Sequence, residues 1–320
     1  MAHGLTHLLV RAAASLAATA FIVAAPASAH ADETDNISCH GRLTVDAEAM
    51  LDGWVNARIR SALDRANRRG VVSCDADCLF GELRRKIGSS VPVPWTWIPH
   101  SRFAVWIANA AGVDRCRLRF QESIYGGRPY NQPWLFPVTG RIIFLADSIL
   151  LSGRVVGLDK IDHFIREGRA HHDAFVRGAA SIEDILTGEL GNARQPLAPT
   201  EHGLKGLALT GVVSYADLAA SYAGFRFWQD LLTLGRPGSL VAFDAASQRF
   251  VGRRAFTFAA YVNAAWDESI NRSRFHPALG RDVTRALQSG GHPTMTSDCA
   301  ALVVLPDAHL YVNPECFTSE

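Results

Sequence analysis

The chain has 320 residues, with 32 basic and 31 acidic side chains, so its formal net charge at pH 7 is +1. Nucleic acids and anionic membrane surfaces are bound mainly by proteins with an excess of positive charge. The nearly equal numbers of basic and acidic side chains argue against either as the main partner. The sequence contains no G-x-S-x-G elbow, P-loop or dinucleotide fingerprint, which argues against a standard α/β-hydrolase and against those nucleotide-binding classes.

Residues 1–31 are predicted to be a cleavable secretory signal peptide. Arg11 precedes an apolar run over 12–25, and the overlapping small-x-small patterns 27–29 and 29–31 suit signal peptidase. The run is shorter than the about 20 apolar residues that span a bilayer, although an uncleaved anchor is the alternative. We therefore expect an exported protein, periplasmic or secreted, with no membrane span after cleavage and a net charge near zero.

All six cysteines follow the predicted signal peptide, and an even number in an exported chain indicates up to three disulfides. Cys299 and Cys316 are expected to pair because both lie in the C-terminal tail. Cys74 and Cys78 either close a small loop or pair elsewhere. A zinc site is the rival interpretation of this C-x3-C, but no second pair stands at zinc-ligand spacing.

The apolar periodicity predicts one mainly helical domain over 32–320, with its core in 141–290 and a short, disulfide-linked, β-like C-terminal tail. Gly70 is expected to end the first helix. Residues 91–95 are expected to be extended because two prolines restrict them, 125–137 to be a loop, and 140–151 to be a strand or a helix. The tail strands are predicted at 300–305 and 309–312, and helices at 45–69, 79–87, 102–111, 159–178, 181–190, 214–234, 255–272 and 277–288.

The first polar block lies in the predicted helix 159–178. Asp159, His163, Glu167 and His171 are spaced by four residues and share one helical stripe, with Lys160 beside it. Such a stripe can bind a metal or supply a base with its orienting carboxylate. The spacing differs from the H-E-x-x-H of zinc proteases. The alternative is a solvated face on which Asp159 interacts with the helix dipole.

The second block contains Glu201 and the sequence Ser214-Tyr215-Ala216-Asp217. Ser214 and Asp217 have the form of a capping box, which is the structural interpretation. In the functional interpretation, Glu201 and Asp217 divide the acid and base roles. Tyr215 belongs to an aromatic stripe that is more typical of a core than of a ligand shelf, and Gly224 in the same helix would permit another helix to approach closely.

The third block is Trp266-Asp267-Glu268 followed by Asn271. Asp267 and Asn271 would share a helical face, with Glu268 beside it, so this block could close a site from another helix. The alternative is a terminal helical turn with solvated carboxylates.

Together, D-K-x-x-H-F from Asp159, S-Y-A-D-L from Ser214 and W-D-E from Trp266 resemble a family of uncharacterised exported bacterial proteins. The resemblance covers roughly 150–275 and implies a shared fold and site, with no known activity. The first element alone is similar to one in VanZ-like membrane proteins, whose membrane helices are absent here.

The leading hypothesis is a hydrolase or lyase acting on an envelope or extracellular small molecule or polymer. His163, Glu201 and Asp217 are its candidate catalytic residues, with Asp159 orienting His163. The candidate ligand-binding residues are Lys160, Glu167, Tyr215, Trp266 and Glu268. No cofactor is identified, although a divalent metal would suit these side chains. The alternatives are a non-catalytic exported binding or structural protein with a buried polar network, and a metal-binding protein. No oligomeric state is predicted.

Overall fold

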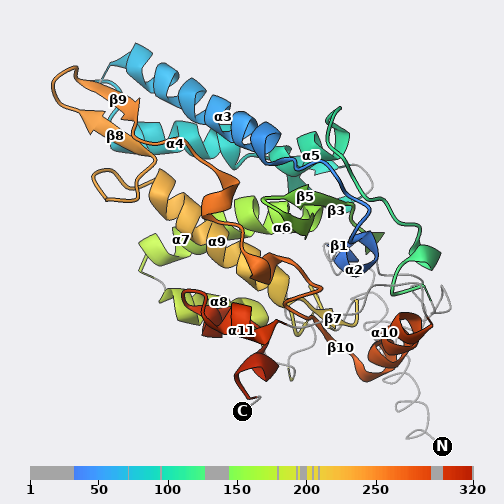
Figure 1. The fold of residues 1–320 in the computed structure, drawn as a ribbon. Helices are drawn as coiled ribbons and strands as arrows, with labels where there is room; N and C mark the ends of the chain where they lie inside the picture. Colours follow the sequence, from blue (N-terminus) through green and yellow to red (C-terminus); the bar gives the residue numbers. More distant parts are fainter. Residues whose placement is uncertain are drawn as a thin grey trace, which may run out of the picture.

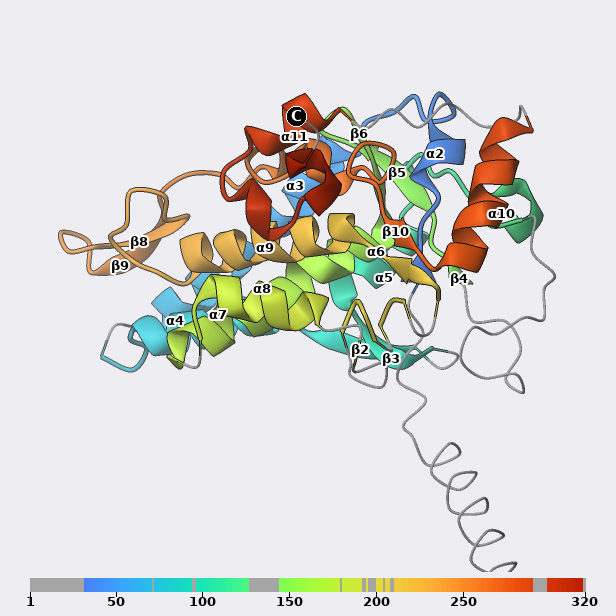
Figure 2. The same ribbon diagram turned by 90° about the horizontal axis from the view of Figure 1, so that it is seen from below.

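The central element of the fold is helix α9 (Tyr215–Leu231), which other helices surround (Figures 1 and 2). Its residues are buried on nearly all sides, as expected for an Ala- and aromatic-rich helix inside a domain. The computed structural model describes residues 32–70, 72–93, 96–126, 144–178, 180–191, 194, 200–203, 205–207, 210–289 and 298–318.

A second long helical segment packs along α9. It consists of α6 (Leu158–Asp162), a π-helical turn η2 (His163–Glu167) and α7 (Gly168–Val176). Helix α8 (Ile182–Leu190) follows and also contacts α9. The sequence predicted the helix over 159–178 but not the π turn in its middle.

Helices α3 (Glu48–Arg69) and α4 (Ala76–Ile87) form a pair on one side of this centre (Figure 1). The seven buried residues of α3 are the ones that recur at three- and four-residue steps in the sequence. Gly70 ends the helix with a φ of +71°, a left-handed value that favours glycine. Helix α5 (Arg102–Asn109) begins after Ser101, whose side chain caps it. These predicted helices are confirmed.

The strands described in the structure pair only in twos, so the mainly α fold class is confirmed. β1 (Asp32–Glu33) and β4 (Phe144–Leu145) are parallel. The antiparallel pairs are β2 (Ser90–Val93) with β3 (Thr96–Ser101), β5 (Ser148–Leu151) with β6 (Arg154–Gly157), β7 (Val212–Val213) with β10 (Arg274–Phe275), and β8 (Val241–Asp244) with β9 (Arg249–Gly252).

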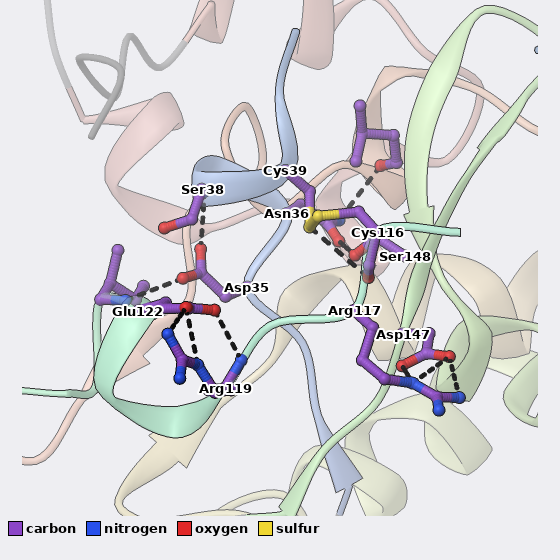
Figure 3. Close-up of a disulfide and its surroundings, with 12 residues drawn as sticks. Asp35, Asn36, Ser38, Cys39, Cys116, Arg117, Arg119, Glu122, Asp147 and Ser148 are labelled. Carbon is purple, nitrogen blue, oxygen red and sulfur yellow. Dashed lines mark hydrogen bonds and ion pairs between the residues drawn. A yellow bond between two sulfur atoms is a disulfide. The ribbon is translucent and has the colours of Figure 1, made fainter. Parts of the chain in front are cut away.

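The N-terminal segment is tied firmly into the domain (Figure 3). Short helix α2 (Asn36–Cys39) carries the Cys39–Cys116 disulfide, and the Asn36 side chain donates to the carbonyl of Val155 at 3.1 Å. Asp35 accepts hydrogen bonds from the amides of Ser38 and Ile124, the latter just after the 3-10 turn η1 (Phe120–Glu122). These contacts fix the segment that leads into the buried cluster described below.

The predicted helix over 255–272 is wrong. The chain there forms two 3-10 turns, η3 (Phe258–Ala260) and η4 (Ala264–Trp266), joined by irregular backbone. Polar side chains of α3 bind the backbone that a helix would use. Asn56 exchanges two hydrogen bonds with the backbone of Phe256, and Asp52 accepts one from the amide of Phe258. The tertiary hydrogen bonds therefore outweigh the helix propensity of the local sequence.

The C-terminal tail is helical instead of β-like. After α10 (Pro277–Gln288), which is confirmed, come α11 (Cys299–Val303), η5 (Ala308–Leu310) and η6 (Pro314–Phe317). Asp298 caps α11 through its side chain, a local signal for a helix that outweighs the apolar, strand-like run after it. The Cys299–Cys316 bridge is confirmed, and Cys74–Cys78 closes a small loop, so all six cysteines are paired.

The predicted signal peptide lies outside the described residues, as does the predicted loop from residue 127 onward. Within the described part of the chain, no helix combines the length and the apolar character needed to cross a membrane.

Candidate functional site

Two helices meet backbone to backbone at glycines, and this contact brings the polar blocks together. A Cβ atom on Gly168 would overlap the backbone of Gly224, and one on Gly224 would overlap the carbonyl group of Phe164. Because no side chain separates the helices there, short polar side chains can meet across the contact. The expectation that Gly224 admits a neighbouring helix is confirmed.

The π turn changes the predicted polar stripe. A π turn adds a residue to one helical turn, so residues on its two sides no longer share a straight row. Asp159 therefore faces Lys160 and Thr34, while His163 faces α9 and His171 faces α8. π turns are frequent at functional sites, which makes this local irregularity informative.

The fully buried side chain of Lys160 is the centre of an ionic cluster. Its Nζ lies 2.7 Å from Oδ2 of Asp159, 2.5 Å from Oδ1 of Asp217 and 2.7 Å from Oε1 of Glu268. It also donates a hydrogen bond to Oγ1 of Thr34 at 3.1 Å. A buried ammonium is tolerated only when it is paired, and here three carboxylates face one cation.

Protonation relieves part of this excess negative charge. Burial, assisted by the nearby anions, raises the pKa of Glu268 to about 7 against the opposing charge of Lys160. Burial also raises the pKa of Asp159. For Asp217 burial disfavours the carboxylate, but the charges of His163 and Lys160 outweigh it and lower the pKa. Asp217 therefore stays ionised at neutral pH.

The same three carboxylates, of Asp159, Asp217 and Glu268, are close enough together to be candidate metal ligands. Their oxygen atoms lie within 4.8 Å of one another, which would suit a hard cation such as Ca²⁺ or Mg²⁺. In this arrangement the ammonium of Lys160 contacts all three and supplies the positive charge that a metal would provide. Among the residues that the structure describes, His163 is not a member of such a group.

His163 lies at the boundary between the buried cluster and the exterior, with 19% of its side chain exposed. Its Nε2 is 3.4 Å from Oδ2 of Asp217, and its Nδ1 is 3.3 Å from Oγ of Ser221. Burial alone would lower the pKa of His163, but the charges of Asp217, Glu189 and Glu167 raise it to about 10. The ring is therefore an imidazolium at neutral pH, and Asp217 and Glu189, instead of the expected Asp159, orient it.

Glu189, in the last turn of α8, is a site residue that the sequence analysis missed. Its Oε1 accepts a hydrogen bond from Ser221 at 3.0 Å, and its Oε2 lies 2.6 Å from Nε2 of His171. Burial opposes its charge, but hydrogen bonds from His163 and His171 outweigh that effect and lower its pKa. One signal could have found it: an acidic residue at a helix C-terminus opposes the helix dipole and therefore needs a compensating partner.

Glu201 approaches the same place from the turn after α8. Its amide donates to the carbonyl of Glu189 at 2.9 Å, and its Oε2 accepts from the amide of Ser214 at 3.4 Å. Burial first, and then the charge of Asp217, raises the pKa of Glu201 to about 8. Glu201 is therefore a neutral carboxylic acid near pH 7.

The capping-box interpretation of Ser214 and Asp217 is half correct. Ser214 Oγ accepts from the amide of Asp217 at 3.2 Å, as a cap should. The carboxylate of Asp217 points to Lys160 and His163, and Glu201 takes the amide of Ser214 in its place. Because Glu201 accepts the hydrogen bond from the amide of Ser214, the carboxylate of Asp217 is available to pair with Lys160 and His163.

The N-terminal segment closes the buried side of the cluster. Thr34 donates to the carboxylate of Asp159, and the neighbouring Glu33 accepts a hydrogen bond from Thr210 at 2.6 Å. Burial, assisted by the charges of Asp217 and Glu268, raises the pKa of Glu33 well above its usual range. No pattern in the sequence connected this segment to the site.

The exposed side of the site carries a cation. Glu167, at the end of the π turn, lies 3.4 Å from Nζ of Lys205 and 3.1 Å from Arg166. Lys205 has 34% of its side chain exposed. This pair stands beside His163 and gives the outer edge of the site a mixed charge.

Two of the predicted ligand-binding residues belong to the core. Trp266 is fully buried and its ring lies 5.5 Å from that of Phe164. Tyr215 is buried in the main hydrophobic cluster. Glu268, Lys160 and Glu167 lie in the site as described.

We find no protein-family model, curated protein or solved structure that matches this chain. The resemblance to exported bacterial proteins therefore stays a prediction, and the function is argued from the geometry alone.

Proposed function

We propose that this protein is an exported hydrolase or lyase that cleaves an envelope or extracellular polymer at His163 and its neighbouring carboxylates. The observation that supports this most is the position of His163, which is partly exposed while Lys160 behind it is fully buried. A network that served packing alone would be sealed at that point. His163 instead connects the ionised Asp217 to the exterior.

Two carboxylates whose charges interact with His163, Glu201 and Asp217, have different protonation states at neutral pH. Glu201, with a pKa of about 8, holds a proton that it can donate to a leaving group. Asp217, with a lowered pKa, stays an anion that can act as base or stabilise positive charge. In many hydrolases the carboxylic acid with the raised pKa is the general acid, and the one with the lower pKa is the base or nucleophile. The imidazolium of His163 would hold Asp217 in place and stabilise negative charge that develops on the substrate.

The proposed substrate class follows from the predicted export of the protein and from its net charge. All six cysteines form disulfides, which persist in oxidising environments outside the cytoplasm. Together with the predicted signal peptide, this supports export and a substrate in the envelope or beyond it. The near-zero net charge argues against nucleic acid.

The runner-up is a non-catalytic protein whose polar network only fixes helix packing. The complete burial of Lys160, with at most 10% of any of its partners' carboxylate side chains exposed, favours this interpretation for the inner half of the cluster. The two proposals differ on His163 and Glu201. A catalytic residue can be replaced while the protein still folds, whereas a purely structural pair is needed for folding.

The test combines cleavage with stability. Wild type, His163→Gln and Glu201→Gln are incubated with peptidoglycan sacculi and with neutral and acidic polysaccharides, and new reducing ends and soluble fragments are measured. His309→Gln, at an exposed histidine, is the matched control. We expect cleavage by wild type and the control, a loss of at least 100-fold in both site variants, and a Glu201→Gln variant that is folded near pH 7. Absence of cleavage by wild type, or unfolding of both site variants, would overturn the proposal.

A further inference from the structure

A cavity of about 490 Å³ lies on another side of the molecule, between α3, α4 and the β2–α5 segment. This volume falls within the roughly 300–1,000 Å³ of small-molecule sites. Its walls combine two tryptophans with four cationic side chains, namely Trp54, Trp106, Arg58, Arg85, Lys86 and Arg102. None of these residues takes part in the site of His163.

The cavity has a marked excess of positive charge. No aspartate or glutamate lines it. Arg85 pairs with Glu82 at 2.5 Å, but that carboxylate also pairs with Arg65 at 2.8 Å. Lys86, Arg58 and Arg102 form no ion pair with any acidic side chain that the structure describes.

Trp106 is the partly exposed aromatic side chain of the cavity wall, because Trp54 is buried against Phe103, with ring centroids 4.3 Å apart, and is covered by Arg58. The rings of Trp54 and Trp106 lie 5.8 Å apart, and the guanidinium of Arg58 stands 3.6 Å above the ring of Trp54. Burial lowers the pKa of Arg58, as expected for a cation held against an apolar surface without a counter-ion. Arg102, at the first position of α5, faces the same cavity.

We propose that this cavity binds an acidic saccharide, a sugar segment that carries carboxylates. The apolar face of a sugar ring packs on the partly exposed ring of Trp106, and its carboxylates form charge-assisted hydrogen bonds with the unpaired cations. Several cations around one cavity suit an anion with charges repeated along a chain. A nucleic acid is disfavoured because the protein as a whole lacks a basic field. The proposal rests on these contacts alone and does not depend on the reaction at His163.

The probe is trigalacturonate, and its fully methyl-esterified form is the neutral control with the same rings. Binding is followed at low salt by the intrinsic tryptophan fluorescence and by calorimetry of the full mature chain. We expect trigalacturonate to bind at least tenfold more tightly than the ester. Inorganic phosphate and a short oligothymidylate complete the comparison. Equal binding of the ester, or equal or tighter binding of phosphate or the oligonucleotide, would overturn the assignment.

Variants locate the binding. Arg102→Gln and, independently, Lys86→Gln are expected to weaken trigalacturonate binding roughly tenfold each, since each removes a charge-assisted hydrogen bond. Arg60→Gln is the matched control, because Arg60 is an exposed arginine of α3 that does not line the cavity. Unchanged binding in both Arg102→Gln and Lys86→Gln, with each variant folded, would place the saccharide elsewhere and refute the proposal.

Discussion

Lys160 and Asp217 form an ion pair of 2.5 Å that links α6 to α9. The other oxygen of Asp217 faces Nε2 of His163 at 3.4 Å. The contact with Lys160 is an ion pair and not a well-directed hydrogen bond, since Oδ1 of Asp217 has no donor in suitable geometry among the described residues. One carboxylate thus joins the sealed half of the cluster to its exposed half, and Lys160 holds that carboxylate toward the histidine.

Replacing Lys160 by Met should destabilise the fold strongly. The change leaves three buried carboxylates without their cation, which costs about 3–5 kcal/mol when one partner of a buried pair is removed. The loss should be largest at neutral pH and shrink in acid, where the carboxylates protonate. Urea unfolding at several pH values measures it, and equal stability of variant and wild type at neutral pH would contradict the role given to Lys160.

The same variant tests the metal interpretation. Without the ammonium, the three oxygens that lie within 4.8 Å of one another form a site for a hard divalent cation. We expect Ca²⁺ or Mn²⁺ to raise the melting temperature of Lys160→Met and to leave that of wild type unchanged. A similar rise in wild type would show that a metal binds despite Lys160.

Glu201→Gln should alter the pH dependence of stability. The folded-state pKa of Glu201, about 8, exceeds its unfolded value of about 4.5. The stability that the proton provides is thus complete below pH 4.5 and is lost as the pH rises to 8. The free energy of unfolding of the variant should therefore exceed that of wild type by an amount that grows to a few kcal/mol between pH 4.5 and 8. Above pH 8 the difference should stay constant. Glu183→Gln, at an exposed site of α8, should show no such gain.

His163→Gln should reduce the dependence of the unfolding free energy on pH above neutrality. The pKa of His163 is raised from about 6.5 to about 10 in the folded protein. Its contribution is therefore complete below pH 6.5 and is lost between pH 6.5 and 10. Guanidinium unfolding over this range measures the difference, and parallel curves for the variant and wild type would show that the imidazolium is not stabilised as described.

Gly224→Ala should disrupt the contact between α9 and the π turn. The added Cβ would overlap the carbonyl group of Phe164, which is backbone and cannot rotate away. We expect a loss of at least about 3 kcal/mol by overpacking. Gly53→Ala in α3 is the matched control, since its Cβ would meet open space and the better helix propensity should add about 0.5–1 kcal/mol. Thermal unfolding of the two variants in opposite directions confirms the prediction.

Removing the Cys39–Cys116 bridge should cost more stability than removing Cys74–Cys78. The first bridge joins residues 77 apart in the sequence and the second residues four apart, so the first restricts the unfolded chain more. We expect about 2–5 kcal/mol for the Cys39→Ser/Cys116→Ser pair and clearly less for the other. Equal losses in calorimetry would contradict this ranking.

The sequence was informative where local signals agree with burial. Helix α3 ends at the predicted residue and has the predicted buried face because its apolar period and the glycine after it both favour that helix, although it begins at Glu48 instead of residue 45. The segment 255–272 was also predicted to be a helix but forms 3-10 turns, because side chains of α3, 200 residues away in the sequence, bind its backbone. Such non-local competition leaves no mark on the period of the local sequence.

For the site, the sequence by itself determined which residue types are present, and it identified Lys160, His163, Glu201, Asp217 and Glu268. Only the tertiary structure decided their partners. The π turn and the contact at Gly224 set which oxygen faces which nitrogen, and they brought in Glu189 and Thr34. The physical reason is that Coulomb energies, pKa values and burial depend on distances of a few ångströms between segments far apart in the chain, and those distances arise only when helices pack.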